Sequence, residues 1–329
     1  MVAPLPVAAD GQGSRMSAGW AVAAAQAVLV AAVAPLLLGF TRAVRARLEG
    51  RGGGRIAQPW RDLRKQFRKE PLIPADAGVF FAAAPAVLTA TSLMVAAAVP
   101  YLSTQNPLAS STDLIVVVGL LLLGTVALAL AGLDTGTAFG GMGASREMTI
   151  AALVEPTLLL SVFALSTRVG STNLSAIVAA GTTDQARVFS PASALAAAAL
   201  AIATLAEAGR LPVDNPATHL ELTMVHEAMT LEYSGRDLAL VEWASAMRLT
   251  ILLGLLATVF VPWGVATNLH PVAVALAAAL FVAKLCVLSG LLAVAEVFTA
   301  KLRLFRVPEL LAGSFVLGLL AVITSAVLA

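Results

Sequence analysis

Residues 207–216 read Glu-Ala-Gly-Arg-Leu-Pro-Val-Asp-Asn-Pro, and long apolar runs flank them on both sides. This stretch opens an acidic block that extends to Glu242 and holds seven carboxylates against two arginines. Charge packed against apolar helices is costly unless it is solvated or paired. The block is therefore the strongest functional indication in the sequence, and the runs around it indicate membrane helices.

The composition agrees with a membrane protein. The 329 residues are 59% hydrophobic and 12% charged, and the mean hydropathy is +0.89, whereas soluble domains carry about 25% charged residues. Several apolar runs reach the roughly 20 residues that a helix needs to cross a bilayer. The alternating segments of a transmembrane barrel are not visible. The sequence therefore predicts an all-α integral membrane protein.

We expect residues 1–17 to form a flexible N-terminus and residues 18–329 to form a single polytopic membrane domain. The apolar runs predict about eight spans. They lie near residues 18–40, 78–99, 113–132, 149–167, 190–207, 239–262, 271–297 and 309–328. The fifth span is mostly alanine and starts at Pro191, a favoured first helical position.

Basic residues are distributed unevenly between the loops. Sixteen of the 21 follow the first, third, fifth or seventh span, and ten of these lie between Arg42 and Lys69. Because cytoplasmic loops are enriched in Lys and Arg, we expect these loops inside the cell and both termini outside, in the cell inner (plasma) membrane. The basic loop 41–77 and the acidic loop 207–238 then share the cytoplasmic side. A soluble partner or anionic lipid can bind there.

The acidic block has its own predicted local structure. Pro212 cannot lie inside a regular helix, so the fifth span should end near Glu207 and turn through Gly209 to Asp214. Asn215 and Pro216 form a helix start, which predicts an amphipathic cytoplasmic helix from about residue 216 to 232. Tyr233-Ser-Gly235 should then break the chain before the sixth span.

Two interpretations of the clustered carboxylates remain open. They form either a solvated acidic surface, or a proton-conducting or partner-coupling cluster whose mutual repulsion brings some pKa values towards neutrality. A metal site is not expected, because His219 and His226 are seven residues apart, whereas metal ligands on one helix face are typically three or four residues apart.

Ionisable residues inside predicted spans are also candidates. Glu155 lies inside the fourth span, Lys284 is central in the seventh, and Glu296 lies near its cytoplasmic end. Such residues usually face a cavity or a partner. Arg248 in the sixth span is expected to snorkel to the interface. The glycines of residues 140–147 predict a tight cytoplasmic turn before the fourth span.

Three stretches resemble the family of respiratory complex I subunit 1, the quinone-site subunit, and within it the hydrogenase branch represented by formate hydrogenlyase subunit 4. They are residues 207–227 with Glu232-Tyr-Ser-Gly235, residues 58–71 (Gln-Pro-Trp-Arg to Lys-Glu-Pro), and residues 140–147 followed by Val154-Glu155-Pro156. The branch is indicated by Gly209-Arg-Leu-Pro-Val-Asp214, where complex I members typically have Asn-Arg-x-Pro-Phe-Asp.

The resemblance implies roles for individual residues. It places the acidic block in a polar opening beneath a peripheral arm, with Glu155 continuing the route into the membrane, and it places loop 58–71 against a cluster-bearing small subunit. Lys284 and Glu296 are added because they lie inside a predicted span. The expected ion-path residues are then Glu155, Glu207, Asp214, Glu221, Glu227, Glu232, Lys284 and Glu296. The expected docking and loop residues are Arg61, Asp62, Lys65, Glu70, Arg146, Glu147 and Arg210.

The expected function is a membrane subunit that anchors the [NiFe]-hydrogenase and iron–sulfur arm of a complex I-related hydrogenase or hydrogenlyase. It would couple electron transfer to proton or sodium movement. The implied partners are a hydrogenase-like large subunit, an iron–sulfur small subunit, antiporter-like membrane subunits and lipid, with no nucleic acid.

The single cysteine, Cys286, cannot hold a cluster, so the chain should have no redox centre of its own and no catalytic or metal-binding residue. The nickel–iron centre and iron–sulfur clusters are expected in partner subunits. The alternatives are a quinone-site subunit of complex I, a purely structural anchor, and a standalone ion transporter.

Overall fold

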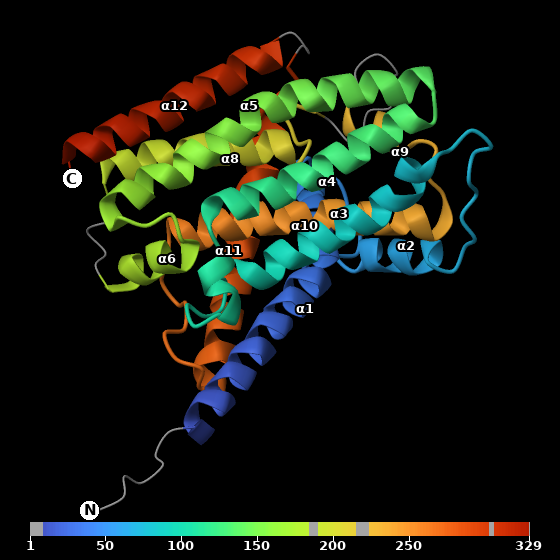
Figure 1. The fold of residues 1–329 in the computed structure, drawn as a ribbon. Helices are drawn as coiled ribbons and strands as arrows, with labels where there is room; N and C mark the ends of the chain where they lie inside the picture. Colours follow the sequence, from blue (N-terminus) through green and yellow to red (C-terminus); the bar gives the residue numbers. More distant parts are fainter. Residues whose placement is uncertain (1–8, 184–189, 215–223, 303–305, 329) are drawn as a thin grey trace, which may run out of the picture.

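The computed structural model describes residues 9–183, 190–214, 224–302 and 306–328, and this part of the chain is helical, with no β-strand (Figure 1). The helices are α1 (Ala9–Leu48), α2 (Gln58–Gln66), α3 (Val79–Ala98), the 3-10 helix η1 (Pro107–Ser111), α4 (Leu114–Asp134), α5 (Ala138–Val169), α6 (Leu174–Thr183), α8 (Pro191–Glu207), α9 (His226–Thr230), α10 (Gly235–Val259), α11 (Pro271–Phe298) and α12 (Val307–Leu328).

The predicted all-α membrane architecture is confirmed. Among the described residues, seven helices are long and apolar enough to cross a membrane: α1, α3, α4, α5, α10, α11 and α12. The fifth predicted span is α8, which begins at Pro191 and ends at Glu207. It has 17 residues and is thus shorter than the roughly 20 residues that a helix needs to cross a bilayer. Helix α1 begins at Ala9, inside the segment expected to be a flexible N-terminus.

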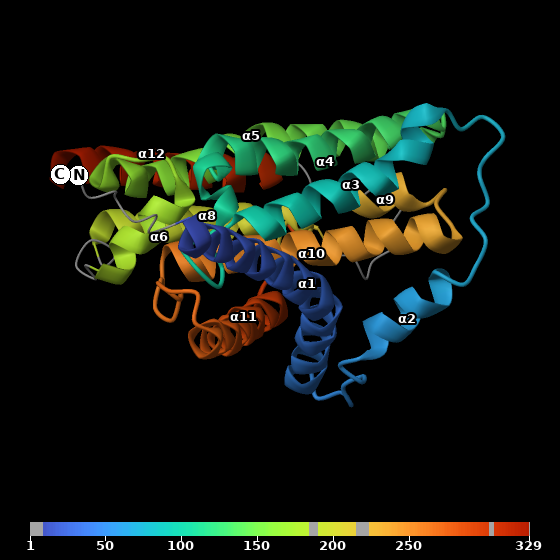
Figure 2. The same ribbon diagram turned by 60° about the horizontal axis from the view of Figure 1, so that its bottom comes forward.

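Helix α10 is the centre of the bundle. It packs against α3, α1, α11, α2 and α8, while α4, α5, α8 and α12 form a neighbouring layer (Figures 1 and 2). In the most apolar 18-residue segment of each helix, 72% of the residues are buried in α10, compared with 22% in α11 and 28% in α12. The long outer faces of α11 and α12 are therefore the surfaces available to lipid or to other membrane subunits.

The two ends of the bundle differ in structure. Helices α2 and α9 lie at one end, and α6 lies at the other (Figures 1 and 2). Helix α2 packs on α1 and α10, and α9 packs on α5 and α4. The charged contacts described below lie at or near the end that carries α2 and α9, which we call the polar end.

Within the described residues, the membrane helices α1, α3 and α5 each contain an internal proline, and in α1 and α3 an aromatic residue satisfies the carbonyl that the proline frees. Pro35 has no N–H for the carbonyl of Ala31, which instead accepts a hydrogen bond from Trp243 Nε1 of α10 at 2.9 Å. Trp60 Nε1 of α2 donates to the adjacent carbonyl of Ala32 at 3.0 Å. Helix α1 changes direction along its length (Figure 2).

The second proline, Pro85 of α3, likewise leaves the carbonyl of Phe81 without its helical donor. The Tyr233 hydroxyl donates to this carbonyl at 2.8 Å, and the Tyr233 ring stacks on the Phe81 ring with centroids 4.1 Å apart. Burial raises the pKa of Tyr233, so the hydroxyl keeps the proton that it donates. Tyr233, two residues before α10, thus satisfies the carbonyl that Pro85 frees in α3.

Two local predictions are wrong. Residues 140–147 form no turn but lie in the first turns of α5, which Thr137 caps through its side chain to the Gly140 N–H. Gly143 allows close packing there, because a Cβ on it would meet Ala228 Cβ and the Val225 carbonyl oxygen, each at 2.9 Å. The glycines therefore serve helix contacts and not a bend.

The long amphipathic helix predicted for about residues 216–232 is also not continuous. Met224 and Val225 are not helical, and α9 covers only five residues. Its Ala228 and Met229 are buried, and the helix packs against α5 and α4. The helix start predicted at Pro216 lies outside the described residues.

Candidate functional site

The centre of the polar end is an ion pair between Glu207, the last residue of α8, and Arg248 of α10. Arg248 Nη2 also donates to Thr125 Oγ1 at 2.6 Å and to the Leu121 carbonyl at 3.0 Å, both on α4. Arg248 is 8% exposed. The prediction that it snorkels to the interface is wrong, because its guanidinium has three partners inside the bundle and binds α4, α8 and α10 together.

A small cavity adjoins this pair. Its volume is about 10 Å³, enough for roughly one water molecule, and it is lined by Glu147, Glu207, Asp214 and His226 together with apolar side chains. The lining comes from α5, α8, the 208–214 turn and α9. Segments distant in the sequence therefore bring three carboxyl groups and an imidazole to one point.

His226 links this cavity to α10, because its Nε2 lies 3.0 Å from Ser245 Oγ. Burial lowers the pKa of His226; Arg248 adds to this shift, while Asp214 and Glu207 oppose it. The imidazole is therefore neutral at neutral pH, with one nitrogen able to donate and the other able to accept.

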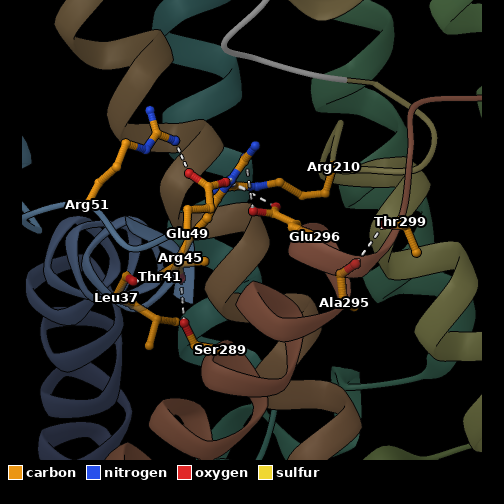
Figure 3. A network of polar contacts seen from close by, with 10 residues as sticks. All are labelled: Leu37, Thr41, Arg45, Glu49, Arg51, Arg210, Ser289, Ala295, Glu296 and Thr299. Atoms are coloured by element: carbon orange, nitrogen blue, oxygen red, sulfur yellow. Dashed lines mark hydrogen bonds and ion pairs between the residues drawn. The ribbon is translucent and has the colours of Figure 1, made fainter. Parts of the chain in front are cut away.

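Glu296 of α11 forms the second buried ion-pair group. Its two oxygens lie 3.5 Å from Arg45 Nη1 of α1 and 3.5 Å from Arg210 Nη1, respectively (Figure 3). Arg45 also donates to Glu49 at 2.9 Å. Burial lowers the pKa of Arg210, and Glu296 opposes that shift. This group, with Thr41 Oγ1 2.5 Å from Ser289 Oγ, joins α1 to α11 and to the acidic block.

Asp214 closes the turn that follows α8. It is 5% exposed and lies 2.8 Å from Lys301 Nζ, just after α11. The turn itself has Gly209 at φ +56° and a cis bond before Pro212. The predicted end of the fifth span at Glu207 and the turn through Gly209 to Asp214 are confirmed.

Glu155 lies near the middle of α5, deeper in the bundle than Glu147. It is 7% exposed, and neither carboxyl oxygen has a hydrogen-bond partner among the described residues. The charged groups that act on it electrostatically are Glu207 and Arg248. Glu155 is therefore a buried acid next to an ion pair, but it has no partner of its own.

The other predicted ion-path residues are more scattered. Lys284 donates to the carbonyls of Val261, at 2.5 Å, and Trp263, after the C-terminal end of α10. Glu227 is half-buried on α9, Glu232 is exposed beyond it, and Glu221 lies outside the described residues. The structure thus brings Glu147, Glu207 and Asp214 together around one cavity, with Glu155 nearby. Within the described residues, the hydrogen bonds of Lys284 go to backbone carbonyls and not to an acid.

The predicted docking residues are mostly on the surface of the polar end. Arg61, Lys65 and Glu70 are exposed, and Asp62 accepts a hydrogen bond from Gln58 at 2.9 Å. Arg146 is half-buried and donates to the Met224 carbonyl at 3.0 Å, which ties α5 to the segment before α9. Of this group, Glu147 and Arg210 belong to the buried contacts described above.

Sequence reasoning missed several members of the site. Arg45 and Lys301 lie just after predicted spans and Thr125 lies inside one, all outside the acidic block, and the sequence gives no specific signal for them. The sequence indicates neither the Ser245 contact of His226 nor the Glu207 pairing of Arg248. Across the described ranges, no group of three or more His, Cys, Asp or Glu side chains is placed to hold a metal ion.

The chain is similar to known membrane subunits. The model of the NADH dehydrogenase family matches residues 21–327. Hydrogenase-4 component C of Escherichia coli (strain K12) is 37% identical over 247 residues, which are 75% of this chain and 77% of that protein. Formate hydrogenlyase subunit 4 of the same strain is 34% identical over 303 residues, which are 91% of this chain and 96% of that protein.

A solved structure shares the fold. A chain of the membrane-bound sulfane sulfur reductase, an archaeal respiratory membrane complex, matches with a TM-score of 0.80 at 19% identity, over 93% of this chain and 98% of that chain. The resemblance seen in the sequence is thus confirmed over nearly the whole length. The chain belongs to the NADH dehydrogenase family, which is the family of respiratory complex I subunit 1.

Proposed function

We propose that this chain is the membrane subunit that anchors the [NiFe]-hydrogenase and iron–sulfur arm of a complex I-related hydrogenase or hydrogenlyase. In this role it couples electron transfer in the arm to movement of protons or sodium ions. The names of the two E. coli relatives support the hydrogenase assignment. The observation that carries the coupling is the buried Glu207–Arg248 pair together with the buried acid Glu155, which has no hydrogen-bond partner among the described residues.

The proposed route begins at the cavity between Glu147, Asp214 and His226. A cavity of this size holds a water that can exchange protons with the lining groups. The route continues to Glu207 and then to Glu155 within α5. Each of these groups accepts and releases a proton, and Arg248 compensates one negative charge along the way. Glu227 and Glu232 extend the polar opening.

We further propose that the polar end faces the cytoplasm and carries the arm. The exposed cations Arg61 and Lys65 of α2 and the acidic residues of the block present both signs of charge, which fixes the orientation of a docked partner. Arg146 and Glu147 lie at the start of α5, beneath the same surface. Antiporter-like membrane subunits and lipid then cover the outer faces of α11 and α12.

Two experiments test this proposal. The tagged chain is extracted gently from its native membrane, and nickel and iron–sulfur subunits without flavin are expected to copurify. Ion translocation is then measured in membrane vesicles. Glu155→Gln and Glu207→Gln should abolish it while the complex stays assembled, whereas Asp76→Asn, on the exposed loop before α3, should leave it unchanged. Translocation that survives both glutamine variants would refute the route.

A quinone-site function is the second candidate. It predicts an amphipathic pocket between the first and seventh spans that opens to lipid. Helices α1 and α11 are instead packed together, with Thr41 hydrogen-bonded to Ser289 and Arg45 paired with Glu296. These contacts favour the hydrogenase assignment. Copurification of flavin, an NADH-oxidising module and bound quinone would reverse this preference.

A further inference from the structure

Arg248 pairs with Glu207 and acts electrostatically on Glu155, two acids that differ sharply in their surroundings. Glu207 accepts hydrogen bonds from Arg248 and from Thr125, the latter at 3.3 Å. Glu155 is as deeply buried, but its two oxygens accept no hydrogen bond within the described part of the chain. Two ionised carboxylates beside one guanidinium would leave an uncompensated buried charge, which is strongly disfavoured. One of the two acids must therefore hold a proton.

The hydrogen bonds of Arg248 within the described part of the chain are all made by one nitrogen. Nη2 donates to Leu121, Thr125 and Glu207. On α4 the position facing Nη1 is Gly124, where a Cβ would lie 3.0 Å from that nitrogen. The absence of a side chain on Gly124 allows the guanidinium to lie this close to α4. Helix α5, which carries Glu155, packs against both α4 and α8.

The charged and titratable groups around this centre are few. They are Glu207 on α8, Glu147 and Glu155 on α5, His226 on α9 and Asp214 on the turn, and Asp214 already has Lys301 as its partner. Helix α4 contributes the Thr125 hydroxyl in this region. Among the described residues, Arg248 is thus the cation that acts on both Glu207 and Glu155.

We infer that Arg248 is an exchanging counterion, which pairs with Glu207 when Glu155 is protonated and with Glu155 when Glu207 is protonated. In the exchange a proton binds to the Glu207 carboxylate and another leaves the Glu155 carboxyl group. One positive and one negative charge are present before and after, so the net charge of the three groups does not change. The structure corresponds to the state in which Glu207 is paired. The link to ion movement rests on the proposed function, but the exchange itself does not.

Infrared spectroscopy of the purified complex in lipid nanodiscs tests the exchange without an activity assay. Glu155→Gln should remove one carboxylic-acid C=O band from the wild-type spectrum, which assigns that band to Glu155. Glu207→Gln should remove the same band although Glu155 is still present, because Arg248 is then free to pair with it. Persistence of the Glu155 band in Glu207→Gln would overturn the inference.

Removal of the positive charge of Arg248 should increase the carboxylic-acid band, whereas the two glutamine variants decrease it. Arg248→Gln leaves both acids without a counterion, so the acid band should grow about twofold as both take up protons. Arg248→Lys keeps the charge and should retain the wild-type band, and it serves as the folding control. Glu296→Gln, in the separate group with Arg45 and Arg210, should leave the band unchanged. An unchanged band in Arg248→Gln would show that Arg248 is not the counterion.

The two proposals fail separately. Vesicles of the wild-type complex that move no ions, combined with the expected infrared changes, would refute the proposed function and leave the exchange intact. Normal ion movement together with a Glu155 band that is unchanged in Glu207→Gln would refute the exchange alone.

Discussion

The hydrogen bond from Trp243 to the carbonyl that Pro35 frees can be tested by restoring the missing backbone donor. In Pro35→Ala, residue 35 regains an N–H, and that N–H can bind the Ala31 carbonyl within α1. Trp243→Phe removes the indole N–H but keeps an aromatic ring. The substitution should therefore be costly in the wild-type background and much less so when residue 35 is alanine.

The expected size follows from the burial of the group. The Ala31 carbonyl belongs to a residue that is 7% exposed, so its oxygen gains little from solvent when Trp243 is lost. Hydrogen bonds between membrane helices average about 0.6 kcal/mol and reach about 1.7 kcal/mol, and a buried polar group left unpaired costs about 1–3 kcal/mol. We expect Trp243→Phe to cost about 1–2 kcal/mol, with a coupling energy to Pro35→Ala of about 1 kcal/mol.

The assay is chemical unfolding of the detergent-solubilised chain, followed by circular dichroism. Tyr233→Phe with Pro85→Ala is a second cycle of the same design, since Tyr233 donates to the carbonyl freed in α3. The crossed combination, Trp243→Phe with Pro85→Ala, should be additive because those groups share no contact. Equal costs of Trp243→Phe in the presence and absence of Pro35 would refute the reasoning.

Three further predictions concern the polar end. Because the pKa of His226 is lowered in the folded chain from its ordinary value of 6.5, the unfolded chain binds the proton more readily, and stability should fall as the pH drops below that value. In His226→Gln the melting temperature should fall less steeply as the pH drops, which thermal melts at several pH values can measure. An unchanged pH dependence would contradict the assignment. Gly143→Ala should overpack α5 against α9 and cost about 1–3 kcal/mol, whereas Gly141→Ala, whose Cβ would lie 3.8 Å from Leu133, should be tolerated. Glu155→Leu should raise stability by about 1–3 kcal/mol, because it removes a buried group that has no partner. A loss of stability in that variant would show that Glu155 is structural.

The helices were predictable from the sequence because membrane spans depend on length and hydropathy, which are local properties. The limits of α8 followed from Pro191 at its start and from Gly209 and Pro212 after its end. The turn predicted for residues 140–147 failed for a different reason. Glycine permits a turn and equally permits two helices to approach closely, and only the position of α9 against Gly143 decides between them.

The pairing of charges could not be predicted, since it depends on contacts between distant segments. The acidic block showed its seven carboxylates in the sequence, but the cations that pair with Glu207 and Asp214 come from elsewhere. Arg248 lies on α10, and Lys301 lies after α11. A lone arginine in a span, such as Arg248, is equally consistent with snorkelling and with a buried pair until the facing helices are known.

Pairing also distinguishes Glu155 from the other buried acids. Glu296 and Asp214 each lie within 3.5 Å of a cation from another segment, and such pairs join segments whether or not an ion moves. Glu207 has a partner too, but it shares that partner electrostatically with Glu155. Asp214, Glu296 and Glu155 are all buried. Of these three, Glu155 is the one whose carboxyl oxygens have no hydrogen-bond partner within the described chain to offset the cost of burial. A group that must change its protonation would explain burial without a partner, which is why the proposed function assigns the step into the membrane to Glu155 of α5.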